Sequence, residues 1–267
     1  MTLELIIGGL ALAVALINLY FLWQLRGHFA RLPFGDLVTK HDLAVTTSTS
    51  LERHFQQVQA LKRLSHELDM PTPLPPMRGW AASPDFLLTA YQAARRSRPL
   101  LVVECGSGVS TLIMARALQQ NGEGQILTLD HNGVFAQKTR DLLAEHGLAD
   151  YAQVLHAPLT PMDIDGESFN WYGYEAPEDL SVDMLIVDGP PEEGPHTLAR
   201  FPAGPCFIPH LNAGGIILVD DSQRPNEQTA VRRWIERYPG LSSEYLQLEK
   251  GCLLVTREGE TSGGHQP

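Results

Sequence analysis

Short apolar runs alternate with helical patterns from Pro99 almost to the end of the chain, and this alternation limits the fold most strongly. The runs include LLVVE, QILTLD, AQVLHA, DMLIVD and GGIILVD, and helical patterns such as STLIMARALQQ separate them. Continuous apolar runs are typical of parallel strands that helices cover on both faces. The last two runs, joined at residues 249–251, indicate an antiparallel hairpin. We therefore predict a mostly parallel α/β sheet with helices on both faces and a C-terminal hairpin.

The length and charge of the chain narrow the class of protein. Its 267 residues suffice for one well-buried domain with additional segments. The 20 basic and 31 acidic residues give a net charge of −11, which argues against a nucleic-acid partner, since such binders need a basic surface. The three cysteines have neither a disulfide-type nor a zinc-type spacing. We expect a reducing compartment and a neutral or cationic ligand.

The N-terminus carries an apolar stretch from Leu3 to Leu25. As a helix it would span roughly 35 Å, slightly more than the ~30 Å hydrocarbon core of a bilayer. Arg26 and Arg31 follow it, whereas no basic residue precedes it. By the positive-inside rule we expect residues 1–25 to be a single-pass signal-anchor helix in the cytoplasmic (inner) membrane, with the remaining chain in the cytoplasm. A cleaved signal peptide is disfavoured because the stretch has neither a basic leader nor a cleavage site. A buried core helix is disfavoured because the stretch is apolar all round and lies outside the pattern of the α/β domain.

Residues 26–76 connect this stretch to the α/β domain. Apolar residues recur there at steps of three and four, which predicts an amphipathic helix of about three heptads. These residues are Leu51, Phe55, Val58, Leu61, Leu64 and Leu68. The helix is either a stalk that forms a homodimer or an element that packs against the domain. The segment MPTPLPPM, residues 70–77, indicates a stiff linker, so we place the domain at residues 77–257 and a disordered tail at 258–267.

Ligands bind at the carboxyl ends of the strands in parallel α/β sheets. The residues that end the predicted strands are Glu104, Asp130, His156, Asp188 and Asp220. Two glycines follow the first of them in VVECGSGVST, residues 102–111. A pyrophosphate-binding turn needs a third glycine, where this chain has Thr111. The carboxylate of Glu104 would repel a phosphate but hold an ammonium group, which favours a ligand with a nucleoside and an amine but no phosphate.

The motifs VVECGSGVST and LTLDHN, the latter at residues 127–132, resemble those of the class I S-adenosylmethionine-dependent methyltransferases. The segments DMLIVDGPP and NAGGIILVDD and the terminal hairpin extend the resemblance over about residues 80–257. The resemblance implies a Rossmann-like, seven-stranded, mostly parallel sheet whose last strand is antiparallel. It also implies S-adenosylmethionine (SAM) as cofactor. We expect methyl transfer to an oxygen of a small-molecule or lipid-linked acceptor.

The resemblance also assigns cofactor-binding residues. The first motif, which contacts the methionine part of SAM, corresponds to Glu104, Gly106, Ser107 and Gly108. Asp130 corresponds to the acid that binds the ribose hydroxyls, His131 would lie near the adenosine, and Ala157 would lie near the adenine. The alternatives are an ordinary strand-to-helix turn for the glycines and a local turn for Asp130.

A second group of carboxylates ends two predicted strands, Asp188 on one and Asp220 with Asp221 on the next. At ~5 Å with an effective dielectric of ~20, each pair would repel by about 3 kcal/mol, so Mg²⁺, Arg224 or protonation must compensate. The arrangement resembles the metal-dependent O-methyltransferases of the catechol and macrolide-sugar kinds. That resemblance implies Asp188, Asp220 and Asp221 as magnesium ligands that prepare an acceptor hydroxyl. In the alternative, Asp221 caps a helix that begins near Pro225.

Two histidines, His196 and His210, are candidate bases, although lone histidines are commonly structural. We take Asp188 and His210 as the candidate catalytic residues. The segment WYGYE, residues 171–175, predicts an aromatic loop that covers a ligand or packs. Two other function classes stay open. One is an NAD-dependent oxidoreductase, which Glu104 and the missing third glycine disfavour, and the other is a noncatalytic membrane-anchored scaffold that retains the fold.

Overall fold

The computed structural model describes Tyr20 and residues 40–75, 77, 82–192 and 198–259. The chain divides into two compact units, residues 1–51 and 52–267. Of the first unit, only Tyr20 and the first part of helix α2 are described. The sheet and every other described helix belong to the second unit.

A seven-stranded sheet in the order β3-β2-β1-β6-β7-β9-β8 forms the centre of the second unit. Its strands are β1 (Leu101–Cys105), β2 (Gln125–Asp130), β3 (Ala152–His156), β6 (Val182–Val187), β7 (Leu211–Val219), β8 (Leu241–Leu246) and β9 (Cys252–Arg257). The first five are parallel, and β9 runs antiparallel to both β7 and β8. The predicted sheet with its C-terminal antiparallel hairpin is therefore confirmed.

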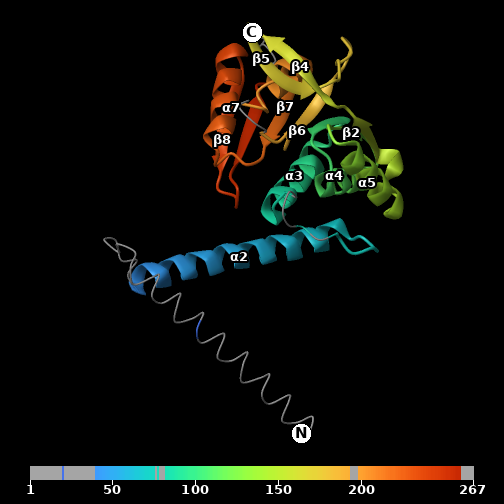
Figure 1. The fold of residues 1–267 in the computed structure, drawn as a ribbon. Helices are drawn as coiled ribbons and strands as arrows, with labels where there is room; N and C mark the ends of the chain where they lie inside the picture. Colours follow the sequence, from blue (N-terminus) through green and yellow to red (C-terminus); the bar gives the residue numbers. More distant parts are fainter. Residues whose placement is uncertain (1–19, 21–39, 76, 78–81, 193–197, 260–267) are drawn as a thin grey trace, which may run out of the picture. The chain divides into compact units, whose positions relative to one another are not determined.

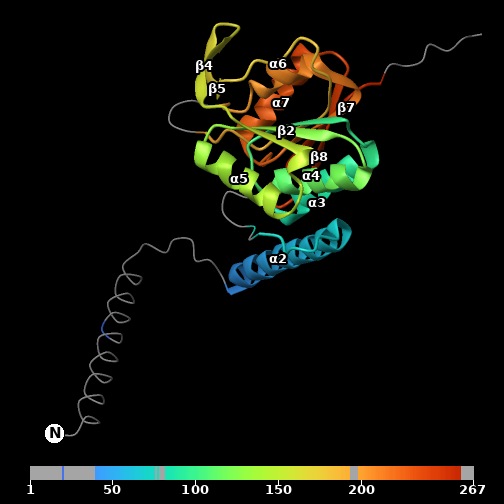
Figure 2. The same ribbon diagram turned by 90° about the vertical axis from the view of Figure 1, so that its right-hand side faces the viewer.

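Helices cover both faces of the sheet, as the apolar runs require (Figures 1 and 2). One face carries α3 (Pro84–Ser97), α4 (Val109–Asn121) and α5 (Gly133–Glu145). The other carries α6 (Ala203–Phe207) and α7 (Pro225–Arg237). Single-turn helices, η1 (Ala149–Tyr151) and η2 (Ile208–His210), precede β3 and β7. Each face has its own hydrophobic core, so the strands between them are buried almost throughout.

The helix α7 shows how a single glycine permits close packing. The indole N–H of Trp234 donates a 2.8 Å hydrogen bond to the carbonyl of Phe201, and the ring is fully buried. A Cβ at Gly204 would lie 2.2 Å from the indole nitrogen, so only glycine fits beneath this ring. The bulky ring and the bare backbone together bring α6 and α7 into contact.

A separate two-stranded sheet consists of β4 (Leu159–Ile164) and β5 (Glu167–Tyr172). The prediction of an aromatic loop at residues 171–175 was therefore partly wrong, because its first two residues end a strand. Asp165 and Gly166 join the two strands with positive φ angles of 56° and 82°, as a type I′ turn requires. The Asp-Gly pair between alternating side chains is the sequence signal for this hairpin.

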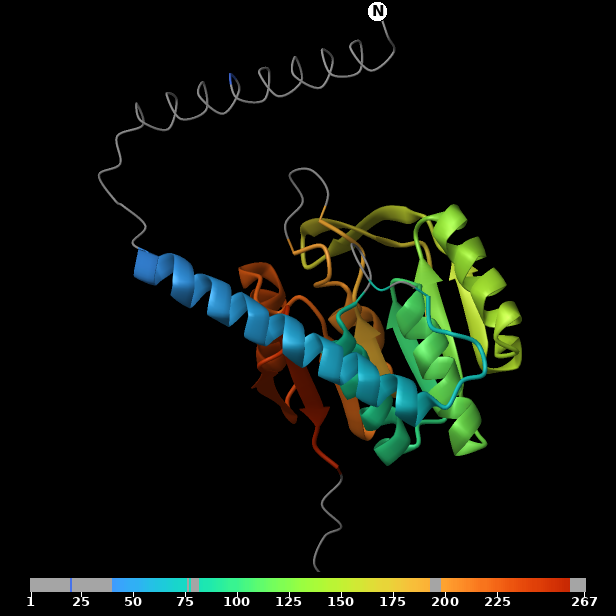
Figure 3. The same ribbon diagram turned by 90° about the horizontal axis from the view of Figure 1, so that it is seen from below.

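The helix α2 spans Lys40–Leu68, and its C-terminal part packs on the domain (Figure 3). Leu64 and Leu68 are fully buried in the core beside α3 and α4, whereas the exposed fractions of Phe55 and Val58 are 57% and 62%. The carbonyl of Leu68 accepts a 2.8 Å hydrogen bond from Arg116. Of the two alternatives for this helix, packing therefore applies to its last turns. The hydrophobic core begins before residue 77.

The predicted membrane anchor, residues 1–25, lies outside the described residues except for Tyr20. Within the part of the chain that the structure describes, no helix has both the length and the apolar character needed to cross a bilayer. Most of the predicted disordered tail also lies outside the described residues, which end at Gly259. The anchor, the inner-membrane location and the tail stay predictions.

Candidate functional site

A cavity of about 320 Å³ opens where β1, β2 and β6 end. Its wall includes Gly106, Ser107, Asp130, His131, Tyr172 and Asp188. The volume lies at the lower end of the range of roughly 300–1,000 Å³ that is usual for small-molecule sites. The carboxyl edge of the sheet, where ligands of parallel α/β proteins bind, is thus the place where the predicted motifs meet.

The turn after β1 is held between the ends of two neighbouring strands. The amide of Gly106 donates a 2.9 Å hydrogen bond to the carbonyl of Leu129 in β2. Its φ angle is +98°, and a Cβ there would lie 3.3 Å from the backbone of Asp188, which follows β6. Only glycine therefore suits this position. The turn leads directly into α4, whose first residues, Val109 and Ser110, line the cavity.

Asp130 ends β2 and ties the turn after β1 to the turn after its own strand. Its Oδ2 atom accepts hydrogen bonds from the amide of Ser107 at 3.2 Å and from the Ser107 hydroxyl. Its Oδ1 atom accepts one from the amide of Asn132 at 2.8 Å. Asn132 in turn caps α5. A buried carboxylate thus stands at the cavity wall with its position fixed by three donors.

Glu104 lies beneath the turn and not at the cavity wall. It is fully buried, and its Oε2 atom accepts hydrogen bonds from the hydroxyls of Thr111 at 2.6 Å and Thr128 at 2.8 Å. The Thr111 oxygen also accepts the amide of Gly108. Thr111, which stands where a pyrophosphate turn has its third glycine, therefore links Glu104 to the turn. Burial raises the pKa of Glu104 to about 7, although hydroxyl donors oppose the shift.

The remaining predicted cofactor residues differ in their placement. His131 lies at the cavity wall, and its ring centroid is 6.5 Å from that of Tyr172. Ala157 is buried beside the end of β2, where its amide donates a 2.8 Å hydrogen bond to the carbonyl of Asp130. Ala157 is not itself among the described residues that line the cavity.

The prediction of His210 as a catalytic residue does not fit the structure. His210 ends η2, immediately before Leu211 begins β7. It therefore lies at the amino end of that strand, whereas the cavity opens at the carboxyl ends of the strands. The nine residues of β7 separate the two edges, a distance of roughly 30 Å at about 3.3 Å per residue. The other candidate histidine, His196, lies outside the described residues.

Two aromatic side chains line the cavity: Phe135, which the sequence analysis missed, and Tyr172, which belongs to the aromatic segment 171–175. Phe135, in the first turn of α5, lines the cavity and is 49% exposed. Tyr172 is 1% exposed, and its hydroxyl has no hydrogen-bond partner among the described residues. The tyrosine lies close to the segment after β6, because a Cβ at Gly189 would come within 2.6 Å of its hydroxyl oxygen. A ligand would give this hydroxyl the partner that a buried polar group needs.

The acidic cluster beyond β6 and β7 surrounds a buried arginine that the sequence analysis also missed. Nη2 of Arg200 donates to Oδ2 of Asp221 at 2.8 Å and lies 3.5 Å from Oδ1 of Asp188. Its Nε lies 3.7 Å from Glu227. The predicted compensating residue, Arg224, is half exposed and also contacts Asp221, at 3.2 Å. The sequence offered no signal for Arg200, because it comes from the irregular segment between the strands.

The predicted magnesium ligands do not fit a divalent ion in this arrangement. Asp188 and Asp221 face the guanidinium, and an ion at ~5 Å from it would be repelled by about 7 kcal/mol at an effective dielectric of ~20. Asp220 is fully buried, and neither of its carboxyl oxygens has a hydrogen-bond partner among the described residues. Its burial together with the charge of Asp221 raises its pKa to about 6. Burial and the neighbouring Asp220 raise the pKa of Asp188 well above its usual value. Among the described residues, no group of three or more His, Cys, Asp or Glu is arranged to hold a metal.

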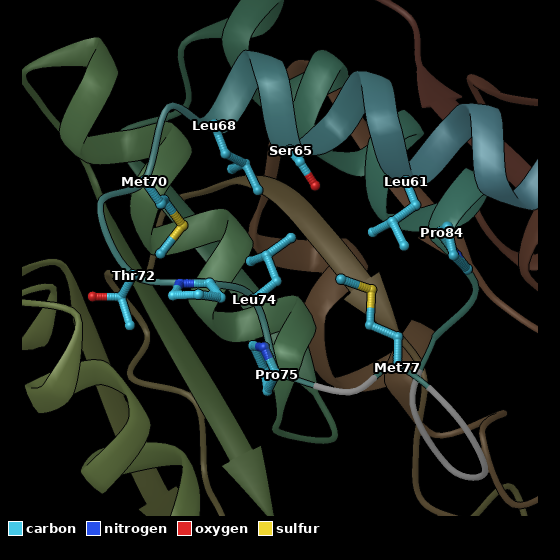
Figure 4. A pocket seen from close by; sticks show the side chains of 10 residues that line it. Leu61, Ser65, Leu68, Met70, Thr72, Leu74, Pro75, Met77 and Pro84 are labelled. Atoms are coloured by element: carbon cyan, nitrogen blue, oxygen red, sulfur yellow. The ribbon is translucent and has the colours of Figure 1, made fainter.

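A second cavity, of about 500 Å³, lies between the end of α2 and the segment that follows it (Figure 4). Leu61 and Leu68 of the helix and Leu74 and Met77 of the segment line it. No lining residue has a titratable side chain. Although this cavity is larger, the polar groups and the fixed turns converge on the smaller one, which is therefore the candidate site.

Residues 103–222 match the sequence profile of a family described as a methyltransferase domain. The matched range contains the turn after β1, Asp130 and the three aspartates of the acidic cluster. Residues 103–222 of the chain therefore form a methyltransferase domain. No curated protein sequence matches the chain.

Solved structures of methyltransferases are similar to this chain in fold. The SAH-bound methyltransferase PaMTH1 of Podospora anserina superimposes with a TM-score of 0.50 at 16% identity, over 85% of this chain and 98% of its own. The O-methyltransferase TomG of Streptomyces achromogenes, in complex with SAM, gives 0.48 at 20% identity over 76% and 89%. An O-methyltransferase from Bacillus cereus, in complex with SAH, gives 0.49 at 16% identity over 75% and 91%.

Proposed function

We propose that this methyltransferase transfers the methyl group of SAM to an oxygen of a small-molecule or lipid-linked acceptor at the cytoplasmic face of the membrane. The observation that carries the proposal is the position of Asp188 at the wall of the cavity, beside the turn after β1. A carboxylate there suits an acceptor hydroxyl, because it accepts that group's hydrogen bond and then its proton. The apolar stretch from Leu3 to Leu25 supports the membrane location.

The residues around the cavity suit SAM, which when bound supplies a methyl group activated by its attachment to a sulfonium. Asp130 would accept the hydrogen bonds of the ribose hydroxyls, since its carboxylate is buried at the cavity wall. The turn at residues 106–108, which lines the cavity, would lie beside the methionine part. Phe135 and His131 offer ring faces to the adenine. Glu104 would act from below by fixing the turn.

The reaction asks little more of the chain than alignment and the acceptance of a proton. The acceptor oxygen attacks the methyl carbon in line with the carbon–sulfur bond, so that a carbon–oxygen bond forms as that bond breaks. The hydroxyl proton passes to the carboxylate of Asp188, and the products are the methylated acceptor and SAH. Holding the two reactants in line supplies much of the rate. The raised pKa of Asp188 makes its ionised form a stronger base than an ordinary carboxylate.

The test is methyl transfer by the full-length chain in detergent. The protein is incubated with SAM labelled in its methyl group and with cell extract separated into lipid and aqueous fractions, and labelled products are analysed for O-methyl groups. We expect labelled product from the wild type and a kcat that is about 100-fold lower in Asp188→Asn, with SAM affinity unchanged. Asp179→Asn, a change in an exposed loop, serves as the matched control and should leave the rate unchanged.

Two results would contradict the proposal. One is labelled product that carries its methyl group on nitrogen or carbon. The other is a wild type that binds SAM but labels neither fraction, which would favour the noncatalytic scaffold.

A further inference from the structure

The guanidinium of Arg200 occupies the middle of the acidic cluster, where the sequence analysis placed Mg²⁺. Its exposed fraction is 5%, and it contacts the carboxyl groups of Asp188, Asp221 and Glu227. We propose that Arg200 is the permanent cation of this cluster, that it excludes a divalent metal ion, and that it thereby positions Asp188 without a metal. Arg200 would have this role in the cluster whatever acceptor the enzyme uses.

The backbone contacts of Arg200 show that it is part of the framework. Nη1 donates a 3.0 Å hydrogen bond to the carbonyl of Asp220, and Nη2 donates a 3.2 Å hydrogen bond to the carbonyl of Asp188. These carbonyls follow the ends of β7 and β6, so one side chain joins the carboxyl ends of two neighbouring strands. A planar guanidinium with several fixed donors suits this role better than a single-point cation.

The charges of the cluster fit an arginine better than a metal ion. Asp188, Asp220, Asp221 and Glu227 supply the negative groups. Besides Arg200, the positive groups that face them are Arg224, half exposed and 3.2 Å from Asp221, and Lys250, 3.9 Å from Asp221. Three positive side chains already offset the carboxylates to within one charge. A divalent ion would give the cluster an excess of positive charge unless Arg200 left it.

The coordination geometry that Mg²⁺ requires also argues against a metal ion in the acidic cluster. Mg²⁺ requires oxygen ligands at about 2.0–2.1 Å in an octahedral arrangement. The carboxyl oxygens of Asp188 and Asp221 that face the middle of the cluster are the ones that Arg200 contacts. A metal could use both only by displacing the guanidinium, which would then be left buried with its backbone hydrogen bonds broken. Asp188 lines the cavity as well as the cluster, so Arg200 acts on the reaction through Asp188 as a positioning residue.

The test compares the effect of metal ions on the melting temperature of the full-length protein. Wild type, Arg200→Ala, Arg200→Lys and Arg140→Ala are each melted in EDTA, in millimolar Mg²⁺ and in millimolar Mn²⁺ at constant ionic strength. We expect no metal response in the wild type. We expect Arg200→Ala to melt at a lower temperature in EDTA and to regain several degrees with Mn²⁺ or Mg²⁺, because its carboxylates have lost their cation.

Matched variants separate this effect from simple loss of an arginine. Arg140 donates to the backbone carbonyl of Val154 and contacts no carboxylate in the described structure, so Arg140→Ala should lose stability without a metal response. Arg200→Lys keeps the charge and should show no metal response either. Adding Asp221→Asn to Arg200→Ala should abolish the gain.

The proposal is overturned if the wild type binds Mn²⁺ or Mg²⁺ and Asp221→Asn abolishes that binding. It is overturned equally by a folded Arg200→Ala protein that shows no metal response, since Arg200 would then not be what excludes the ion. Should Arg200→Ala fail to fold, direct titration of Mn²⁺ into the wild type and into Arg200→Lys decides the question. Binding that depends on Asp221 contradicts the proposal, and its absence in both proteins supports it.

Discussion

Replacing Asp130 with alanine is expected to weaken SAM binding by at least about 100-fold. The carboxylate would accept two hydrogen bonds from the ribose, and charge-assisted hydrogen bonds are each worth about 1.5–3 kcal/mol, which corresponds to at least about a factor of 10 apiece. The change also frees the amide of Ser107, which Asp130 holds at 3.2 Å, so the turn after β1 loses its anchor. Calorimetric titration of SAM into both proteins measures the difference.

The control for this experiment is Asp141→Ala on the exposed side of α5. Asp141 contacts only Gln137 among the hydrogen bonds of the described residues, so its loss should leave SAM affinity unchanged. Melting curves of both variants establish that the domain is folded. Undiminished SAM binding by a folded Asp130→Ala protein would remove Asp130 from the site.

The burial of Glu104 makes the free energy of unfolding depend on pH. Its folded-state pKa is raised to about 7, against 4.5 as the ordinary value, because the carboxyl is fully buried. The folded protein therefore holds this proton more tightly than the unfolded chain does. The free energy of unfolding falls as the pH rises from about 4.5 through about 7, and the loss from this group reaches about 3 kcal/mol.

Glu104→Gln should abolish this component, because the amide does not titrate. We expect urea denaturation at about pH 5 and about pH 8 to show that the wild type loses about 3 kcal/mol more than the variant over that interval. Asp188 and Asp220 titrate in both proteins, so their contributions cancel in the comparison. Glu145→Gln, on an exposed residue of α5, should follow the wild type. If the free energy of unfolding of wild type and of Glu104→Gln changes with pH in parallel, then folding does not change the pKa of Glu104 and the prediction is wrong.

The fold could be predicted because its signals are local and repeated. Continuous apolar runs, the spacing of helical patterns and the turn residues at 249–251 predict the sheet, and the structure has all of these elements. The hairpin of β4 and β5 was missed although Asp165 and Gly166 mark its turn. Its strands are only half buried, so the apolar pattern that identified the other strands is weak there.

The site was predicted less completely because tertiary contacts decide which side chains meet. Gly106, Asp130 and Asp188 lie at the carboxyl ends of β1, β2 and β6, and all three line one cavity. Their proximity could be predicted because the sequence motifs indicate the order of these strands in the sheet. Glu104 was expected to face the ligand, but it is the residue before the last of β1 and points beneath the turn toward Thr111 and Thr128. No sequence pattern near position 200 predicts a buried arginine that contacts acidic residues from other segments of the chain.

His210 illustrates the limit of reasoning from residue type. A histidine near a strand is a candidate base only at the carboxyl edge, and the sequence does not show where β7 begins. The structure begins that strand at Leu211, directly after the histidine, and so places His210 at the opposite edge.

Titration of SAM into the full-length chain by calorimetry, in the presence of EDTA, tests most directly whether the cavity beside β1 and β2 binds this cofactor. SAH and NAD are titrated alongside. We expect that one molecule of SAM or SAH binds per chain without added metal, that NAD does not bind, and that Asp130→Ala abolishes the binding of SAM. A folded wild-type protein that binds NAD, or that binds neither SAM nor SAH, would contradict the assignment of the cavity beside β1 and β2 as a SAM site.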